Sequence, residues 1–448
     1  MFLPTKDWSL LRAPWFAAAF LMAWIAGFGN ASAEPSKQNR ANPSTIAKQT
    51  SKSHAITFAS VDGDVQITSE FAGGRMNGCQ QVSASEFAIT IHPERDQIND
   101  SAWYAFRIDS TQPRDVCVRL NYVGGSHRYD PKVSRDGKTW MATPQWVTKR
   151  HPLGSEVELS IPLDGKPIWI AGQELIGGEV LQRWTDTLES LPYVNRSVIG
   201  QSVQGRPLHR LDITDADRPD YVFIVARQHP PEVSGAIGMM HFVETIADAS
   251  PLSEQFRSRY CAAVVPMVNP DGVAQGHWRC NANGVDLNRD WAHFSQPETK
   301  AVVNQLLACR KTDDGRLCLF IDFHSTFDDV FYTTPPKANL FPQGFTDQWL
   351  GAIQGRFPAY EVNRKANHNL QRSTSKAYVA RTLGVTAITY EFGDETDRET
   401  IRTVASGAAE EMMRLLVNLP AGTAEPSIAD RGAAESTDLV AVGADPKR

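Results

Sequence analysis

The sequence lacks any C-x-x-C pair, which excludes the commonest zinc knuckles and the dithiol redox motif. Its six cysteines are spread along the chain as Cys79, Cys117, Cys261, Cys280, Cys309 and Cys318. Such cysteine usage fits an oxidising compartment, in which disulfides form and persist. Disulfides are therefore compatible with the sequence, but the spacing of the cysteines leaves their pairing open.

A basic face is also absent. The chain has 45 Lys and Arg residues against 51 Asp and Glu residues, a formal net charge of −6, and the cations are scattered rather than clustered. Binding to the phosphates of a nucleic acid requires clustered cations. We therefore expect no nucleic-acid partner.

Apolar runs long enough to span a membrane are missing after the first 33 residues. The stretch APWFAAAFLMAWIAGF follows Lys6 and Arg12 and precedes N-A-S-A, which is the three-part layout of a secretory signal. We expect cleavage after Ala33, a periplasmic or secreted location, and no stable membrane insertion of the mature chain. The alternative is an uncleaved anchor, although the run is short for a span of about 20 residues.

Composition predicts five segments in the 448 residues. Residues 1–33 form the signal peptide, the polar residues 34–53 a flexible linker, and the Ala-, Gly- and Pro-rich residues 420–448 a disordered tail. Short alternating runs in residues 54–165 predict a small antiparallel β-sandwich domain. This domain shows no cluster of ionisable residues, so we expect it to pack against and shape its neighbour.

Residues 166–419 have a different pattern of apolar and polar residues. Apolar runs such as YVFIVA, CAAVVPMV, LCLFIDF and AITYEF alternate with helical stretches. This pattern predicts an α/β fold with a mixed, mainly parallel sheet flanked by helices. Ligand sites in such sheets gather at the carboxyl ends of the strands.

Histidine and glutamate side chains stand at these strand ends. His229 and Glu232 follow YVFIVA within RQHPPEVS, His324 ends CLFIDFH, and Glu391 ends ITYE. Two imidazoles and a carboxylate make a ligand set for zinc that leaves a position for water, and a free carboxylate beside it is a natural general base. Alone, H-x-x-E is a weak signal, and a polar turn capping a helix is then the more common explanation.

Five motifs occur in a fixed order: H-P-P-E, N-P-D-G, G-x-D-x-N-R-x-W, D-F-H and T-Y-E. Together they resemble the zinc metallocarboxypeptidase family, and more closely its cytosolic-carboxypeptidase-like branch, in which a β-sandwich precedes the catalytic domain. The resemblance covers about residues 54 to 418 and, with the predicted signal peptide, suggests a secreted bacterial member. It implies a carboxypeptidase-like fold and makes residues 166–419 the zinc carboxypeptidase catalytic domain.

The resemblance also implies roles for individual residues. His229, Glu232 and His324 match the ligands of one zinc ion per chain, and Asp286 matches the carboxylate that orients a ligand histidine. The remaining matches concern catalysis and substrate binding. They are Glu391 as general base, Arg279 as the group that stabilises the oxyanion, and Asn288 with Arg289 as the pair that binds the terminal carboxylate of the substrate.

Two positions depart from the family pattern. No clear match exists for the mobile tyrosine that closes over the substrate, and Tyr332, Tyr360 and Tyr378 are left without that role. Lys376 falls, by counting back from Glu391, where related enzymes place the residue at the base of the side-chain pocket. A cation there would favour an acidic C-terminal residue, whereas the alternative is a solvated lysine at a helix start.

The sequence thus predicts a metallocarboxypeptidase that acts on peptides with a free C-terminal carboxylate and releases an acidic last residue. A cell-wall peptidase or amidase acting on stem peptides is a second hypothesis. A third is a non-catalytic binding module on the same fold, which is disfavoured because all three ligands and the base are present. The exact substrate and the oligomeric state stay open.

Overall fold

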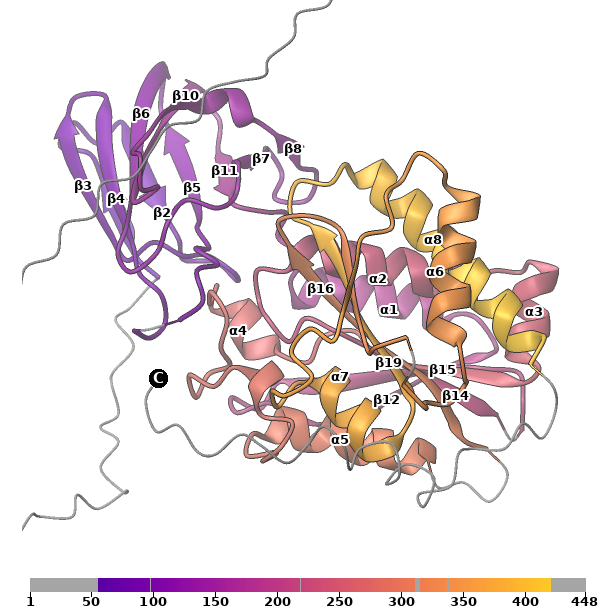
Figure 1. The fold of residues 1–448 in the computed structure, drawn as a ribbon. Coiled ribbons are helices and arrows are strands. Elements are labelled where there is room, and N and C mark those ends of the chain that lie inside the picture. The colour runs from indigo at the N-terminus through magenta and orange to yellow at the C-terminus, as the bar shows by residue number, and fades with distance from the viewer. Residues whose placement is uncertain (1–54, 97, 218, 311–314, 337, 420–448) are drawn as a thin grey trace, which may run out of the picture. The chain divides into compact units, whose positions relative to one another are not determined.

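The structure is a computed structural model that describes residues 55–96, 98–217, 219–310, 315–336 and 338–419 (Figure 1). The predicted signal peptide, linker and C-terminal tail lie outside these residues. Among the helices that are described, none combines the length and the apolar character needed to cross a membrane.

The N-terminal part of the described chain consists of strands in two sheets. One sheet has the order β1-β2-β5-β11-β7-β8 and the other the order β3-β4-β6-β10-β9. The strands are β1 (Thr57–Ala59), β2 (Val65–Thr68), β3 (Gly78–Ser83), β4 (Glu86–Ile91), β5 (Ala105–Ser110), β6 (Pro113–Tyr122), β7 (Lys132–Ser134), β8 (Met141–Ala142), β9 (Val147–Arg150), β10 (Glu156–Asp164) and β11 (Ile168–Ala171), with a short 3₁₀ helix, η1 (Pro144–Trp146).

The strands of this sandwich alternate between buried apolar side chains and partly exposed side chains. In β4, Phe87, Ile89 and Ile91 are fully buried while the residues between them are partly exposed, as expected for strands with one face on a core. Pairing is antiparallel throughout except between β4 and β6, which run parallel. The predicted antiparallel β domain is thus confirmed, with one parallel pair inside it. The predicted domain boundary at 165/166 stays a prediction; β11, which follows it, pairs with β5 and β7.

The second part of the chain is built on a sheet with the order β12-β13-β15-β14-β16-β19-β17-β18. The central strands β15, β14, β16 and β19 are parallel, and β13 and β17 pair antiparallel with their edges. The strands are β12 (Val194–Gln201), β13 (Pro207–Ile213), β14 (Asp220–Ala226), β15 (Tyr260–Val265), β16 (Leu317–Thr326), β17 (Val330–Thr333), β18 (Arg364–Ala366) and β19 (Thr386–Gly393). This confirms the predicted mixed α/β sheet.

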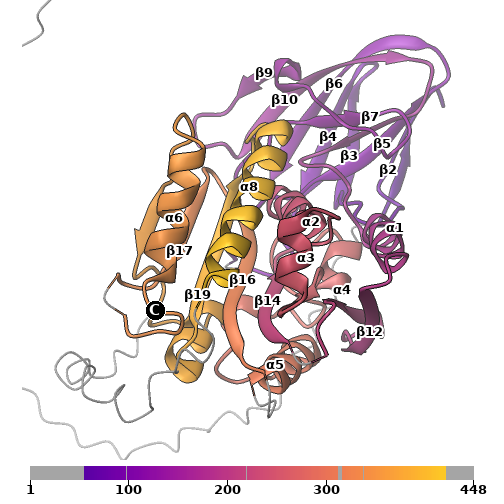
Figure 2. The same cartoon turned by 90° about the vertical axis from the view of Figure 1, so that its right-hand side faces the viewer.

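Helices cover both faces of this sheet (Figures 1 and 2). They are α1 (Gly178–Glu189), α2 (Val233–Ile246), α3 (Pro251–Arg257), α4 (Pro270–Ala274), α5 (Pro297–Arg310), α6 (Phe345–Arg356), α7 (Ser375–Tyr378) and α8 (Arg398–Val417), with a 3₁₀ turn η2 (Leu287–Arg289) and a π turn η3 (Val379–Leu383) that continues α7.

The strand β14 shows how the two cores are divided. Val222, Ile224 and Ala226 face the core shared with α1, α2, α3, α6 and α8. Phe223 and Val225 face the opposite core, which includes α5, α7 and η3. In the sequence, a strand buried on both faces is a continuous apolar run. The first polar residues after such a run therefore mark the edge of the sheet.

Candidate metal centre and active-site pocket

The turn between β14 and α2 carries the first two predicted ligands. Arg227 takes a positive φ of 57°, and its guanidinium donates hydrogen bonds to the carbonyl oxygens of Ile176 and Pro230. This arginine thereby folds the chain back on itself, so that His229 lies in the turn and Glu232 precedes the first residue of α2. Arg227 thus has a structural explanation that the motif alone did not provide.

His324 comes from the neighbouring parallel strand, β16. The start of α2 lies very close to it: a Cβ added to Gly235 would come within 2.2 Å of the carbonyl oxygen of His324. Only glycine permits this approach of helix and strand. The close contact brings the turn that holds Glu232 against the end of β16.

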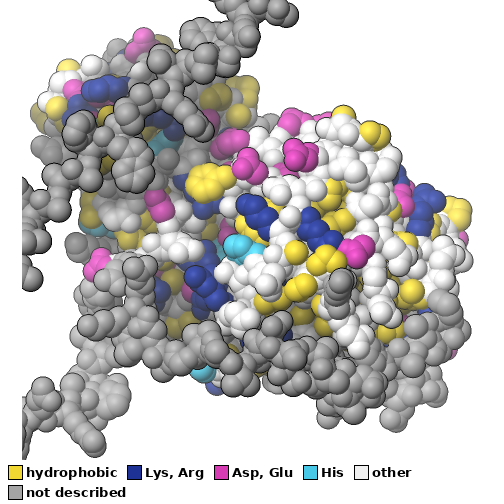
Figure 3. Space-filling model, in the orientation of Figure 1, with side chains coloured by type: hydrophobic (Ala, Val, Ile, Leu, Met, Phe, Trp, Pro, Cys, Tyr) yellow, Lys and Arg dark blue, Asp and Glu magenta, His cyan; other side chains and the backbone are white. Residues whose placement is uncertain are grey.

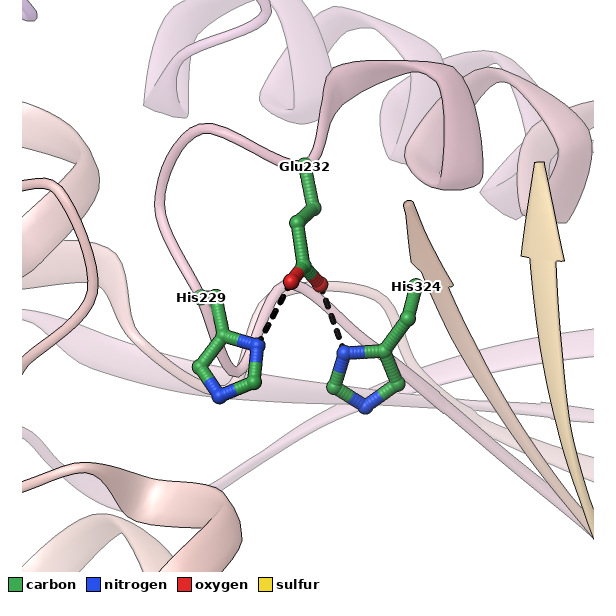
Figure 4. A group of neighbouring side chains, drawn as sticks. All are labelled: His229, Glu232 and His324. Carbon is green, nitrogen blue, oxygen red and sulfur yellow. Dashed lines mark hydrogen bonds and ion pairs between the residues drawn. The ribbon is translucent and has the colours of Figure 1, made fainter. Parts of the chain in front are cut away.

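The triad of His229, Glu232 and His324 is compact and buried, with 4 %, 7 % and 1 % of each residue exposed. Figure 4 shows the Glu232 carboxylate between the two imidazoles. Its Oε1 lies 2.7 Å from His229 Nδ1 and its Oε2 lies 2.6 Å from His324 Nδ1. One ligand atom from each residue lies within 4.8 Å of the others.

This donor set fits zinc. Two imidazole nitrogens and one carboxylate oxygen are a common catalytic zinc set that leaves room for water. Burial opposes ionisation of Glu232, but the adjacent His229 and His324 outweigh it and hold its pKa below the ordinary value. The carboxylate is therefore ready to bind a cation.

Carboxylates also stand behind both imidazoles. His229 Nε2 lies 3.0 Å from Asp286 Oδ1, and the other oxygen of Asp286 accepts a 2.6 Å hydrogen bond from Arg279 Nε. On the far side, His324 Nε2 lies 2.9 Å from Asp322 Oδ2. Such partners fix the tautomer and orientation of a ligand imidazole. The sequence identified Asp286 but missed Asp322, which precedes the ligand by two residues within D-F-H.

Glu391 stands beside His324 because β16 and β19 are parallel neighbours in which these two residues are paired. Burial raises the pKa of Glu391 to about 8, with His324 lowering it and the carboxylates of Glu232 and Asp322 raising it further. A cation bound by the triad would oppose this rise. The geometry places a carboxylate next to the triad.

Asn288 and Arg289 lie on η2, which Asp286 caps by accepting a hydrogen bond from the Asn288 amide. Asn288 Nδ2 is 3.2 Å from His324 Nε2, and its Oδ1 accepts a 3.0 Å hydrogen bond from the Ser375 amide. Arg289 Nη1 donates to the carbonyl oxygen of Asn288. The two predicted carboxylate-binding residues are thus adjacent to the triad.

Lys376 is only 2 % exposed, which rules out the solvated lysine that the sequence left as an alternative. Its Nζ donates a 2.8 Å hydrogen bond to the His368 carbonyl oxygen and lies 5.9 Å from the centre of the Tyr332 ring. Of the three tyrosines without an assigned role, Tyr332 lines the same pocket as Lys376. Tyr360 donates to Asp329, and Tyr378 packs against Trp291 and Phe294.

The triad and the proposed catalytic and substrate-binding residues line one pocket of about 280 Å³. Its lining includes the triad, Arg279, Asn288, Arg289, Lys376 and Glu391, together with Asn99, Asp100, Ser101 and Arg128 from the N-terminal strands region. Lys and Arg side chains also gather around a His near the middle of the face drawn in Figure 3. Arg128, Arg279, Arg289 and Lys376 all line the pocket of the triad, which suits this pocket to an anionic ligand.

The N-terminal region contributes a contact that sequence reasoning missed. The Glu94 carboxylate accepts hydrogen bonds from the backbone amides of Trp278, Arg279 and Cys280 at 2.8, 2.9 and 2.6 Å. It thereby holds the loop that carries Arg279. No local pattern could reveal this role, because the partners are more than 180 residues apart in sequence.

Comparison with known proteins agrees with this geometry. Residues 181–413 match the family model described as zinc carboxypeptidase, and residues 67–171 match the cytosolic carboxypeptidase N-terminal domain. The chain belongs to the zinc carboxypeptidase family. The predicted family, its N-terminal domain and, at the level of family membership, the metallocarboxypeptidase class are confirmed.

The similar curated proteins include cytosolic carboxypeptidase 6 of Caenorhabditis elegans, 33% identical over 59% of this chain and 62% of that protein. Cytosolic carboxypeptidase 6 of Mus musculus is 24% identical over 66% of this chain and 58% of that protein. The chain thus matches about three fifths of the length of these relatives.

Solved structures with the same fold include a metallo-carboxypeptidase from Burkholderia cenocepacia, with a TM-score of 0.65 and 21% identity over 79% of this chain and 98% of that chain. A metallo-carboxypeptidase from Pseudomonas aeruginosa has a TM-score of 0.66 and 19% identity over 78% and 99% of the two chains. Because the identity is this low, these structures support the fold of the chain and nothing about its function.

The predicted periplasmic or secreted location is wrong by these comparisons, because the similar curated proteins are named cytosolic. The six cysteines are free thiols in the structure, and four of them are buried. The prediction rested on the signal-like layout of residues 1–33, which lie outside the described residues.

Proposed function

We propose that this protein is a zinc-dependent metallocarboxypeptidase that hydrolyses the C-terminal peptide bond of peptides and releases an acidic residue. The observation that carries the proposal is the convergence in one pocket of the buried triad, a carboxylate beside it, and three cationic side chains, Arg279, Arg289 and Lys376. Family membership supports the reaction class, and the cations support an anionic substrate end.

We assign His229, Glu232 and His324 as ligands of one zinc per chain. Zinc bound there would polarise the scissile carbonyl and lower the pKa of a water molecule. Asp286 and Asp322 orient the two imidazoles from behind, so that each presents Nδ1 toward Glu232.

Glu391 is the proposed general base. Its carboxylate accepts a proton from the attacking water and returns it to the nitrogen of the leaving residue, so that the same group serves as base and then as acid. Arg279 is held at Nε by Asp286, which leaves its Nη groups to donate to the oxygen of the tetrahedral intermediate.

Asn288 and Arg289 are the proposed site for the terminal carboxylate, because a guanidinium and an amide can donate to both of its oxygens. Lys376 is the proposed partner of an acidic side chain on the last residue. Lys376 is buried, and among the described residues its Nζ forms a hydrogen bond with a carbonyl oxygen and no ion pair, so a carboxylate that reaches it gains strongly from the interaction.

A peptide panel tests the proposal. Matched peptides ending in Glu, Asp, Lys and Phe are incubated with the purified protein, with and without a chelator, and with the C-terminus free or amidated. We expect release of the last residue, preference for Glu and Asp, loss of activity with chelator, and loss of most activity on amidation, which would leave the donors of Asn288 and Arg289 unpaired. Equal cleavage of free and amidated peptides would contradict the proposal.

A further inference from the structure

Arg128 reaches the pocket from the connection between β6 and β7, outside the catalytic sheet. Its Nε donates a 2.7 Å hydrogen bond to Asp394 Oδ2, and its Nη1 donates a 2.8 Å hydrogen bond to Ser101 Oγ. The guanidinium also lies 4.7 Å from the centre of the Phe327 ring. These contacts fix the plane of the guanidinium, and its side chain keeps 10 % exposure.

Within the described part of the chain, Nη2 of Arg128 has no hydrogen-bond partner, although the residue lines the pocket. A guanidinium that is held on three sides and open on one is pre-organised to donate to a ligand, since little entropy is lost when it binds. Structural stabilisation accounts for Nε and Nη1 but not for the open edge.

The pocket lining divides into two groups of contacts. Lys376, His368 and Tyr332 contact one another, and Asn288 is joined to them through the Ser375 amide. Arg128 belongs to the other group, with Ser101, Phe327 and Asp394, and the Asp394 amide in turn donates to the carbonyl oxygen of Thr326, two residues after His324. If the last residue of a peptide occupies the first group, the chain upstream of the scissile bond must leave past the second.

The charge of Arg128 is already matched by Asp394. A second carboxylate would meet a pair that is close to neutral, and Asp100 also lines this side of the pocket. A neutral carbonyl oxygen suits such a donor better than an anion, because it needs a hydrogen bond and no net charge. The upstream main chain of a peptide supplies such oxygens whatever its sequence.

We propose that Arg128 is a substrate-binding residue that donates from Nη2 to a main-chain carbonyl oxygen upstream of the scissile bond. The β-sandwich region would then supply the subsite for the upstream peptide, while the α/β region binds the terminal residue. The proposal rests on the carboxypeptidase function proposed above, but it concerns substrate length and not the identity of the last residue.

The test compares two substrates, of which only one has an amide, and with it a carbonyl oxygen, upstream of the scissile bond. The C-terminal residue is whichever one the wild-type enzyme releases best. It is linked either to a butanoyl group, which keeps the scissile amide but has no amide upstream, or to acetyl-Ala, which adds one upstream carbonyl. In Arg128→Met, we expect kcat/KM to fall about tenfold or more for the acetyl-Ala substrate and less than about twofold for the butanoyl substrate.

Two further variants separate binding from structure. Lys132→Met removes the neighbouring ion pair between Lys132 Nζ and Glu395 Oε2, 2.6 Å long, from residues that do not line the pocket. We expect it to leave the ratio of the two substrates unchanged. Arg128→Lys keeps a cation, and we expect it to retain part of the preference for the longer substrate even if Arg128→Met is poorly folded.

Each other outcome has a defined meaning. If the wild type releases the last residue from no peptide of the panel and from neither short substrate, the proposed function fails. If the wild type cleaves both and Arg128→Met lowers both equally, or Lys132→Met changes the ratio as much, the upstream subsite is overturned while the proposed function stands. An Arg128→Met effect confined to peptides with an acidic upstream side chain would overturn the carbonyl assignment.

Discussion

The α/β region and the β-sandwich region both reach the pocket, but through different parts of their sheets. In the α/β region, His324 and Glu391 occupy paired positions on the adjacent parallel strands β16 and β19, so the sheet itself sets their separation. In the sandwich region, Glu94 and Arg128 lie in connections between strands. Their positions depend on contacts with distant segments, at Trp278 to Cys280 and at Asp394.

The difference suggests that the two regions contribute residues with different functions. Groups that must hold a metal or move a proton need separations fixed to within about 0.5 Å. The paired strands provide this for His324 and Glu391, and the turn folded back by Arg227 provides it for His229 and Glu232. Groups that hold a loop or the upstream substrate can come from connections, where a single side chain suffices. Variants in the two regions should therefore differ in size of effect, from loss of the reaction to moderate changes in stability.

The largest effect is expected from the triad. His324→Ala removes one of three proposed ligands and leaves Glu232 with one histidine neighbour, so zinc affinity should fall sharply and activity should be lost. Metal content by mass spectrometry of the dialysed protein measures this directly. His241→Ala, a half-buried histidine on α2 paired with Glu244, is the control and should keep its zinc. Stoichiometric zinc in a His229→Ala, His324→Ala double variant would rule out the site.

Removal of the proposed base comes next. Glu391→Gln keeps the shape of the side chain but cannot accept the proton, so kcat should fall by about 10²–10⁴-fold while zinc stays bound. Steady-state kinetics with parallel metal analysis separates this result from loss of the metal. Glu395→Gln, four residues further on and outside the pocket lining, is the matched control. Wild-type turnover in Glu391→Gln would exclude this residue from the mechanism.

The sequence predicted the α/β region better than the sandwich region for a physical reason. Strands buried on both faces appear as apolar runs, and the first polar residues after them, such as His229 and His324, mark the sheet edge where ligands bind. Residues at the ends of neighbouring parallel strands lie close together because of the order of the strands in the sheet. The fold class could thus be predicted from local patterns, whereas the three ligands were predicted from these patterns together with the family resemblance.

Other features had no local signal. Glu94 and Arg128 act on segments far away in sequence, and nothing around them differs from ordinary surface charges. The parallel pairing of β4 with β6 depends on the tertiary arrangement of strands that are individually typical of antiparallel sheets. Burial of Lys376 likewise depends on its neighbours His368 and Tyr332, which come from other segments.

A smaller and more selective effect is expected at Lys376. Lys376→Asp should reverse the preference for Glu over Lys at the C-terminus, changing the ratio of kcat/KM values by about tenfold or more, because the favourable charge is replaced by a repulsive one. Lys365→Asp makes the same charge change at an exposed position of β18 outside the pocket lining and should leave the ratio unchanged. An unmoved ratio in Lys376→Asp would remove the support for acidic substrates.

The same residue predicts a pH dependence. Burial lowers the pKa of Lys376 to about 8, against the raising effect of Glu391 and Asp322. The ammonium is therefore charged below about pH 8 and increasingly neutral above it. The preference for Glu over Phe should be full at pH 6.5 to 7, on the order of one unit below this pKa, and should decline as the pH rises through 8. In Lys376→Met this decline should be absent.

The smallest effect is expected at Glu94, and it concerns stability before activity. In Glu94→Gln, the carbonyl oxygen of the amide can still accept hydrogen bonds from Arg279 and Cys280, but its NH₂ group would face the Trp278 amide. Leaving that donor unpaired should cost about 1–3 kcal/mol of unfolding free energy, measured by denaturant titration. Turnover should fall only moderately, because Arg279 keeps its contact with Asp286.

The pH dependence of stability also distinguishes Glu94 from an ordinary surface carboxylate. Burial raises the pKa of Glu94, but the charges of His277 and Arg75 and the backbone amides outweigh it and hold the pKa below its ordinary value. A carboxylate with a lowered pKa stabilises the fold above its unfolded-state pKa, and this contribution is lost as the pH falls through the folded-state pKa. Glu94→Gln should therefore lose less stability on acidification than the wild type.

Glu86→Gln is the control for this prediction. It removes a partly exposed pair with Arg119 and should change stability by about 1 kcal/mol or less. Equal behaviour of the two variants would mean that Glu94 is an ordinary surface charge and that the sandwich region does not hold the Arg279 loop.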